Sequence, residues 1–266
     1  MLECVVNLSE GRSGRLLREI SDLVAGSLLD LHADPDHNRC VVTLVGTDAV
    51  RDLARWAVEN LDLGGHSGVH PRLGTVDVVP FVPLEGSTMQ VALAARDEFA
   101  RWVVSELGIP CFLYGPERSL PEVRRRAWND LAPDLGPREP HVRAGAICAG
   151  ARGPLVAWNL WVDGIDLAAT RAVASRVRTP TIRTLGLRTG AHTQVSVNLV
   201  EPLVDGPCEA YDAIVSELPD GARVVRSELV GLVPRAVLAS IDPDRWEELD
   251  LDDSRTIEAR LARLAR

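Results

Sequence analysis

The stretch GGHSGVHPRLGTVD, residues 64–77, brings together residue types that can do acid–base chemistry. Its glycines allow backbone conformations that other residues avoid, and Pro71 restricts the residue before it to extended conformations. We therefore expect His70 to be held on a defined bend. An imidazole has an ordinary pKa near ~6.5, so it can take up and return a proton at neutral pH. This predicts a general acid/base at His70, suited to group transfer between two nitrogens.

Arg72 follows two residues later and can hold a carboxylate through two parallel hydrogen bonds. A histidine in a glycine-rich loop is often only solvated or hydrogen-bonded, which is the plainer interpretation of this segment. A metal site is a further alternative, because His66 and His70 lie four residues apart and another loop carries His32, Asp34, Asp36 and His37. The glycines and proline disfavour the helix on which that spacing binds zinc, and the accompanying glutamate is missing. Metal binding is therefore the minor alternative.

The composition is that of a globular protein. Apolar residues make up 46% and charged residues 25% of the 266 residues, and the mean hydropathy is close to zero. The sequence has no run of the roughly 20 apolar residues that a membrane-spanning helix needs, so we expect no membrane partner. The first residues, MLECVVNLSEGR, lack the features of a signal peptide, which favours a cytoplasmic location.

The charge and the cysteines bear on the partners of the protein and on the redox state of its compartment. The net charge is −9, and the densest basic run is the short RRR at 124–126, so we expect no nucleic-acid partner. We interpret that run as a solvated helix face, with attraction of an anionic ligand as the minor alternative. Five cysteines are spread along the chain without a C-x-x-C pair, which is typical of buried thiols in a reducing compartment: Cys4, Cys40, Cys111, Cys148 and Cys208.

Short β-branched runs alternate with helical patterns in the first half of the chain. The predicted elements are a strand at 4–9, a helix behind Ser13, strands at 28–34 and 39–46, a helix over 50–61, a strand at 75–83, a helix over 91–103 and a strand at 110–115. Two prolines in 75–83 indicate an edge strand or a bend. Residues 115–153 read as a long irregular connection around a short helix, and such segments are often functional.

The second half repeats the order strand, helix, strand, strand, helix, strand. Its opening strand even shares an Asn-Leu pair with the first, Asn159-Leu160 against Asn7-Leu8. We predict an α/β (α+β) fold of two similar subdomains, residues 1–151 and 152–266, each a mixed β-sheet covered by helices. A ligand cleft or tunnel is expected between them.

Several segments resemble, in order, the formiminotransferase domain of glutamate formiminotransferase, the folate enzyme of histidine breakdown that is fused to a cyclodeaminase in animals. ECVVNLSEGR (3–12) is similar to the family's opening motif, and HPRLGTVDVVPFVP (70–83) closely follows its H-P-R motif. LLDLHADPDHNR (28–39) and SELVGLVP (227–234) match further strands. The resemblance covers nearly the whole chain.

The resemblance implies that N-formimino-L-glutamate binds beside tetrahydrofolate as co-substrate, in a tunnel between two subdomains of a homodimeric enzyme. His70 falls on the catalytic acid/base, and no metal is expected. It also implies that the folate is lined by Gly136, Pro137, Arg138, Glu139, Pro140, His141, Val142, Arg143, Ala144 and Gly145.

Both substrates carry carboxylates, so the residues that we expect to bind them are Arg72, Arg39, Arg12, Asn7 and His32. His32 aligns with an acidic residue of the family that is thought to support the catalytic histidine. Ser67 and Val69 replace a lysine and a glutamate beside that histidine, and Ala144 replaces an aromatic residue. These departures leave open a catalytically silent folate-binding relative, and a metal-dependent hydrolase built on His32, His66 and His70.

Overall fold

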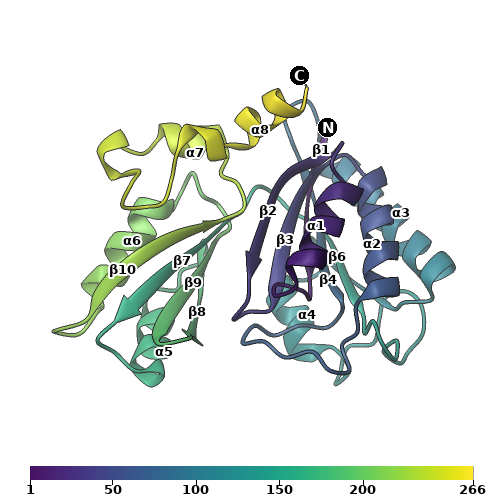
Figure 1. The fold of residues 1–266 in the computed structure, drawn as a ribbon, viewed down its shortest axis with the longest axis horizontal. Helices are drawn as coiled ribbons and strands as arrows, with labels where there is room; N and C mark the ends of the chain where they lie inside the picture. Colours follow the sequence, from purple (N-terminus) through teal and green to yellow (C-terminus); the bar gives the residue numbers. More distant parts are fainter. Residues whose placement is uncertain (266) are drawn as a thin grey trace. The chain divides into compact units, whose positions relative to one another are not determined.

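The computed structural model describes residues 1–265, which form two compact units. Unit 1 comprises Met1–Gly153, and unit 2 begins at Pro154. Figure 1 labels the elements of both units. Each unit is built around one β-sheet, so the predicted fold class of two helix-covered sheets is confirmed.

Unit 1 contains six strands and four α-helices. In chain order they are β1 (Leu2–Leu8), α1 (Gly14–Leu23), β2 (Leu28–Asp34), β3 (Arg39–Val45), α2 (Asp48–Asn60), β4 (Val76–Pro83), α3 (Met89–Trp102), β5 (Cys111–Tyr114), α4 (Leu120–Arg126) and β6 (Ile147–Ala151). A π-helical turn, Val103–Leu107, continues α3. Side-chain caps from Ser13, Thr88 and Ser119 begin α1, α3 and α4, because each oxygen accepts a backbone N–H that the helix leaves unpaired.

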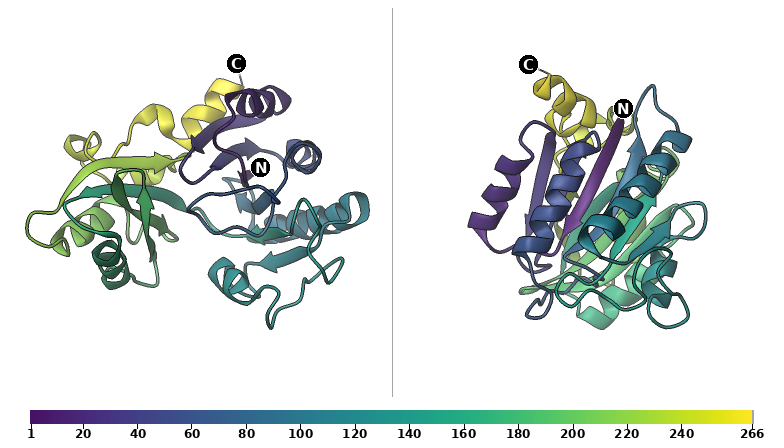
Figure 2. Two further views of the ribbon diagram at one scale, coloured as in Figure 1. Left: turned by 60° about the horizontal axis from the view of Figure 1, so that its bottom comes forward. Right: turned by 90° about the vertical axis from the view of Figure 1, so that its right-hand side faces the viewer.

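The sheet of unit 1 has the strand order β2-β3-β1-β4-β6-β5. Strands β1 to β4 pair antiparallel, and β6 runs parallel to both β4 and β5. Helices α1, α2 and α3 lie side by side on one face of this sheet (Figure 2, right). Antiparallel neighbours run in opposite directions, so the last residues of β1 lie beside the first residues of β3 and β4. The candidate site lies at this end of the three strands.

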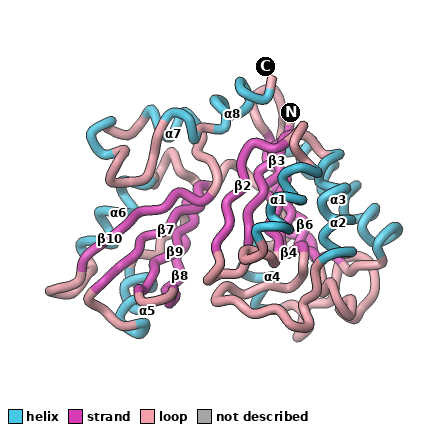
Figure 3. The backbone as a smooth tube through the Cα atoms, viewed as in Figure 1, coloured by secondary structure: helices cyan, strands magenta, loops and turns pink. Residues whose placement is uncertain are grey.

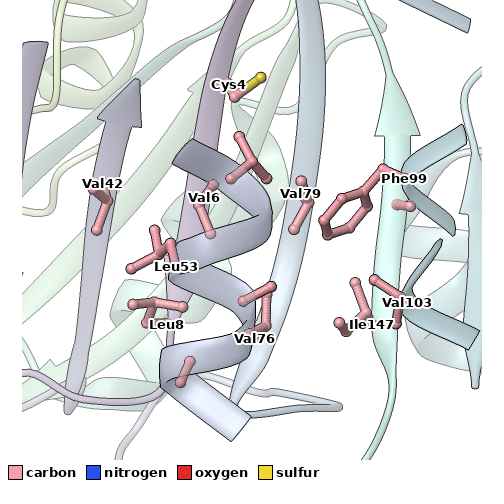
Figure 4. Packing of buried hydrophobic residues seen from close by; sticks show 14 of the residues in the cluster. Cys4, Val6, Leu8, Val42, Leu53, Val76, Val79, Phe99, Val103 and Ile147 are labelled. Atoms are coloured by element: carbon pink, nitrogen blue, oxygen red, sulfur yellow. The ribbon is translucent and has the colours of Figure 1, made fainter. Parts of the chain in front are cut away.

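The main core fills the space between the sheet and α1–α3 (Figure 4). Side chains alternate along a strand, so Cys4, Val6 and Leu8 of β1 all point to this core and are fully buried. Every cysteine is a free thiol, and all except the half-buried Cys208 are buried.

The opposite face of the same sheet divides into two parts. A second cluster, with Phe112, Cys148 and Val123, packs α4 against β4, β5 and β6. Asn7, Val41 and His32 lie in one row across β1, β3 and β2, and directly opposed residues share a face. Since Asn7 alternates with the core-facing Val6 and Leu8, this row lies on the face turned away from α1–α3.

Two expectations for unit 1 were wrong. Strand β4, predicted to be an edge strand or a bend because of its prolines, is central, between β1 and β6. The pairing of β4 with β1 includes Phe81 and Val78 but skips Val79 and Pro80 between them. Pro80 has no N–H, and this gap in the pairing accommodates it. The supposedly irregular connection 115–153 contributes β6, a fully buried strand between β4 and β5.

Unit 2 contains the elements β7 (Val156–Asp163), α5 (Leu167–Arg176), β8 (Ile182–Thr189), β9 (His192–Leu199), α6 (Pro207–Ser216), β10 (Arg223–Val230), α7 (Arg235–Ala239) and α8 (Ile257–Leu264), with 3-10 turns at Pro243–Arg245 and Asp253–Arg255. Its strand order β8-β9-β7-β10 repeats β2-β3-β1-β4 of unit 1. The strands of unit 2 pair antiparallel throughout, so this sheet is not mixed. Asn159 of β7 sits between Ser196 and Glu228, the position that Asn7 takes in β1.

Loops without regular structure connect α2 to β4 and α4 to β6 (pink in Figure 3). The first of these loops carries His70, and the second contains most of the segment expected to line a folate. None of the helices within residues 1–265 is long and apolar enough to span a membrane.

Candidate active site

His70 lies half-buried in the loop before β4, with both ring nitrogens bonded. Its Nδ1 is 2.8 Å from the carbonyl oxygen of Pro71, and its Nε2 is 2.9 Å from Nη1 of Arg39. A carbonyl only accepts and a guanidinium only donates, so Nδ1 must carry the proton and Nε2 must present its lone pair. The hydrogen bonds thus select one neutral tautomer, in which Nε2 is the base.

The pKa of His70 is shifted in the same direction. Burial lowers it well below the ordinary value, and the positive charges of Arg39 and Arg124 lower it further, outweighing the Pro71 carbonyl, which raises it. The ring of His37 lies 5.8 Å away, centroid to centroid, and adds a small effect in the same direction. His70 is therefore neutral at physiological pH.

Arg39 begins β3 and joins His70 to the end of β1. Its Nη2 donates to Oδ1 of Asn7 and its Nη1 to the imidazole of His70, while the buried Nε–H has no acceptor within residues 1–265. Burial lowers the pKa of Arg39 to about 10, so it remains a cation at neutral pH. Arg39 thus holds the base and keeps one N–H donor available.

A buried ion pair lies on the other side of the imidazole. Nη2 of Arg124, in α4, is 2.5 Å from Oδ2 of Asp77, in β4, and the Asp77 side chain is only 3% exposed. Nη1 of Arg124 also donates to the Pro71 carbonyl at 3.0 Å, the same oxygen that accepts Nδ1–H of His70. Oδ1 of Asp77 accepts the backbone N–H of Leu73 at 2.7 Å.

The loop itself is fixed by Arg72 and Asn38. Nη2 of Arg72 donates to the carbonyls of His70 at 2.7 Å and His37 at 3.3 Å, and Nη1 contacts the ring of His66. Asn38, with a left-handed φ of 47°, accepts the N–H of Gly11, which follows β1, and donates to the carbonyl of Ser67 in the loop. Arg72 is engaged with protein groups, and its expected contact with a substrate carboxylate stays a prediction.

Replacing Gly68 by alanine should distort this loop. A Cβ there would lie 2.1 Å from the carbonyl oxygen of His37, which is backbone and cannot rotate away. We expect a loss of about 1–3 kcal/mol in the free energy of unfolding and a loss of activity, because the same loop carries His70. Gly65→Ala is the matched control, since a Cβ at Gly65 meets nothing within 4 Å. Denaturant unfolding of both variants checks this, and equal stability would contradict it.

The remaining predicted substrate residues lie around this group. Arg12 is exposed and donates from Nε to the Pro35 carbonyl at 2.8 Å. His32 is half-buried in β2, two strands from Asn7 along one row, which corresponds to about 10 Å. Arg39 and Asn7 are brought together with His70.

Two of the histidines considered as metal ligands, His66 and His70, form hydrogen bonds within the protein. His66 Nε2 is 3.0 Å from the Asn38 carbonyl, and its ring contacts Arg72. His70 is held by Arg39 and Pro71. In the part of the chain that the structure describes, no three His, Cys, Asp or Glu side chains form a group that fits a metal ion.

Comparisons with known proteins identify the family. Residues 1–152 match the formiminotransferase domain, N-terminal subdomain. The chain is 34% identical to the glutamate formimidoyltransferase of Streptococcus pyogenes serotype M1, over 91% of each protein. It is 30% identical to the glutamate formimidoyltransferase of Thermoplasma acidophilum, over 100% of this chain and 98% of that protein.

The chain belongs to the formiminotransferase family. The formimidoyltransferase-cyclodeaminase of Sus scrofa is 33% identical over 90% of the chain, which corresponds to 51% of that protein. These matches confirm the family and the transferase class predicted from the sequence.

The segment that the formiminotransferase resemblance assigns to folate, residues 136–145, has two distinct parts. Gly136 to Pro140 are exposed. His141 and Gly145 close a tight turn through paired backbone hydrogen bonds of 2.9 and 2.8 Å. The carbonyls of Arg143 and Ala144 then accept the N–H groups of Leu63 and Thr75. The second part is thereby fixed to both ends of the loop that carries His70, and Ala144 is buried within it.

Asp77 and Arg124 belong to the site, although the sequence did not indicate them. Asp77 stands within the formiminotransferase motif itself, and Arg124 stands in the RRR run that was interpreted as a solvated face. Arg125 is exposed and Arg126 pairs with Glu122 and Asp130, so only Arg124 turns inward. Helical spacing carries part of the signal, since Arg124 lies four residues after Leu120, which packs on the cluster beneath α4.

Proposed function

We propose that this formiminotransferase-family enzyme moves the formimino group of N-formimino-L-glutamate to N5 of tetrahydrofolate. The observation that carries the proposal is the neutral imidazole of His70, held so that Nε2 is the base. The names of the relatives, glutamate formimidoyltransferase and formimidoyltransferase-cyclodeaminase, support this chemistry.

The transfer needs one proton carrier. N5 of tetrahydrofolate attacks the formimino carbon and forms a tetrahedral intermediate, and N5 then loses its proton to Nε2 of His70. The same proton goes to the glutamate nitrogen as its bond to the formimino carbon breaks, so glutamate leaves as an amine and the imidazole is again neutral. A positioned general acid/base supplies about 10²–10⁴-fold of the rate enhancement, and holding two substrates together supplies more.

Arg39 links substrate binding to this base. Its Nη1 donates to Nε2 of His70, so that hydrogen bond must open before Nε2 accepts a proton. A substrate carboxylate is a stronger acceptor for a guanidinium than a neutral imidazole. We infer that the carboxylate of the donor draws Arg39 away from His70 and exposes the base.

Tetrahydrofolate enters the proposal through the family and through residues 136–145. The turn at His141 to Gly145 is attached to the His70 loop by the bonds of Leu63 and Thr75, so a ligand on this segment lies near the base. Calorimetric titration with folinic acid, with and without N-formimino-L-glutamate, tests this assignment. Binding that Arg143→Ala weakens supports the assignment, and the absence of any folate binding contradicts it.

The pH dependence of turnover follows from the environment of His70. The base must be neutral, and burial together with Arg39 and Arg124 lowers the pKa of His70 below its ordinary value. Activity is therefore present above that lowered pKa and is lost only as the pH falls through it. We expect the acidic limb of kcat/KM below the ordinary histidine value of ~6.5. A limb at or above that value, in assays from pH 5 to 8, contradicts the role of His70.

A further inference from the structure

We propose that Asp77 and Arg124 are positioning residues for His70, acting through the carbonyl of Pro71. The inference rests on the proposed function only in naming His70 as the base. Arg124 donates to the carbonyl oxygen that fixes the imidazole, and Asp77 holds Arg124 in place.

The connection is a chain of hydrogen bonds across three elements. Nδ1–H of His70 donates to the Pro71 carbonyl at 2.8 Å, Nη1 of Arg124 donates to the same oxygen at 3.0 Å, and Nη2 of Arg124 donates to Asp77 at 2.5 Å. A carbonyl oxygen has two lone pairs, and here both are occupied. The oxygen is thereby fixed in direction, and the ring that donates to it is fixed as well.

Burial makes this arrangement rigid. Asp77 is 3% and Arg124 16% exposed at the side chain, and a buried charge without its partner is strongly unfavourable. Each therefore depends on the other. Oδ1 of Asp77 also accepts Leu73 N–H at 2.7 Å, so the chain segment that follows His70 is attached to the same carboxylate. The pair joins α4 and β4 to the loop at the point where the imidazole sits.

Arg124 has an electrostatic effect as well. The charged or titratable groups that face His70 are Arg39 from β3, Arg124 from α4 and His37 from the β2–β3 loop, while Arg72 bonds the His70 carbonyl from within the same loop. The positive guanidinium of Arg124 disfavours protonation of the imidazole, and Asp77 holds that guanidinium in place. The pair therefore fixes the orientation of the base, and the positive charge of Arg124 favours its neutral form.

Three variants separate positioning from simple structural support. Arg124→Met removes the cation and the bond to Pro71. Asp77→Asn keeps an acceptor for Leu73 N–H but removes the negative charge. Arg124→Lys keeps the cation without the paired geometry. Arg125→Met, on the exposed side of the same helix, is the control. NMR titration of the His70 imidazole is the first readout and needs no substrate; kcat and KM are the second.

We expect Arg124→Met to raise the pKa of His70 and Arg124→Lys to restore part of the shift, while Asp77→Asn leaves the pKa at or below that of the unaltered protein. We expect kcat to fall about 10-fold or more in Arg124→Met and Asp77→Asn, with KM changed far less and Arg125→Met unaffected. A loop that merely loosened would admit water and raise the pKa of His70 in both of these variants. That result, or an unchanged titration in Arg124→Met, would overturn the proposal. The titration stands even if the donor substrate is different, which keeps this test apart from that of the proposed function.

Discussion

Replacement of His70 by alanine is expected to lower kcat/KM for formimino transfer by about 10²–10⁴-fold, the range that a general acid/base supplies. Nε2 of His70 presents the lone pair for the proton of the intermediate, and alanine leaves no base at that position. The fold should be retained, because His70 lies half-buried in a loop and packs in no core cluster. Steady-state kinetics of the purified variant, with circular dichroism of the folded state, measure both effects.

His192→Ala is the matched control for His70→Ala. His192 lies in β9 of unit 2, where Nδ1 bonds Asp163, and it belongs to no group assigned to the site. We expect this variant to keep its activity. Full activity in His70→Ala would remove His70 from the mechanism, whatever the family.

Arg39→Met should have the second-largest effect. Methionine keeps much of the apolar volume but donates to neither Asn7 nor His70 and offers nothing to a carboxylate. We expect kcat/KM for the donor to fall about 10²-fold, mainly through KM, because losing a buried charged hydrogen bond costs about 1.5–3 kcal/mol or more. The acidic limb of the pH profile should move upward, since the cation that lowers the pKa of His70 is gone.

Arg15→Met controls for the loss of an arginine as such, because Arg15 is exposed and pairs with Glu19 on the surface of α1. Donor KM and the pH profile are measured for both variants. An unchanged KM together with an unchanged acidic limb in Arg39→Met would rule out the role of Arg39 as the carboxylate-responsive partner of His70.

Much of the fold could be predicted from the sequence because its strands alternate and its helices have regular apolar spacing. β6 is the exception: after Ile147 the residues of ICAGA, 147–151, are small, and all five are buried, so neither alternation nor a run of β-branched residues marks the strand. Its place depends on parallel pairing with β4 and β5, which is a long-range property. The prediction of an edge strand from Pro80 failed for a related reason. Whether the missing N–H of Pro80 matters depends on how the neighbouring strands pair with it.

The candidate site was predictable in part. Glycines and a proline around His70 mark a fixed loop, and the H-P-R motif points to the residue itself. Its support was not predictable, because Arg39, Arg124 and Asp77 come from β3, α4 and β4 and meet only in the folded chain. The family position aligned with His32 lacks a carboxylate here, and the bonds that the structure gives to Nδ1 and Nε2 come from Pro71 and Arg39 instead.

The most direct test of this account is turnover by the unaltered protein. Purified enzyme is mixed with N-formimino-L-glutamate and tetrahydrofolate, and the absorbance of 5-formiminotetrahydrofolate is followed beside the same assay with His70→Ala. We predict steady formation of the product that depends on both substrates and is nearly abolished in the variant. Binding of both substrates without product at any pH from 5 to 8 would contradict the proposed transfer and point to a silent member of the family.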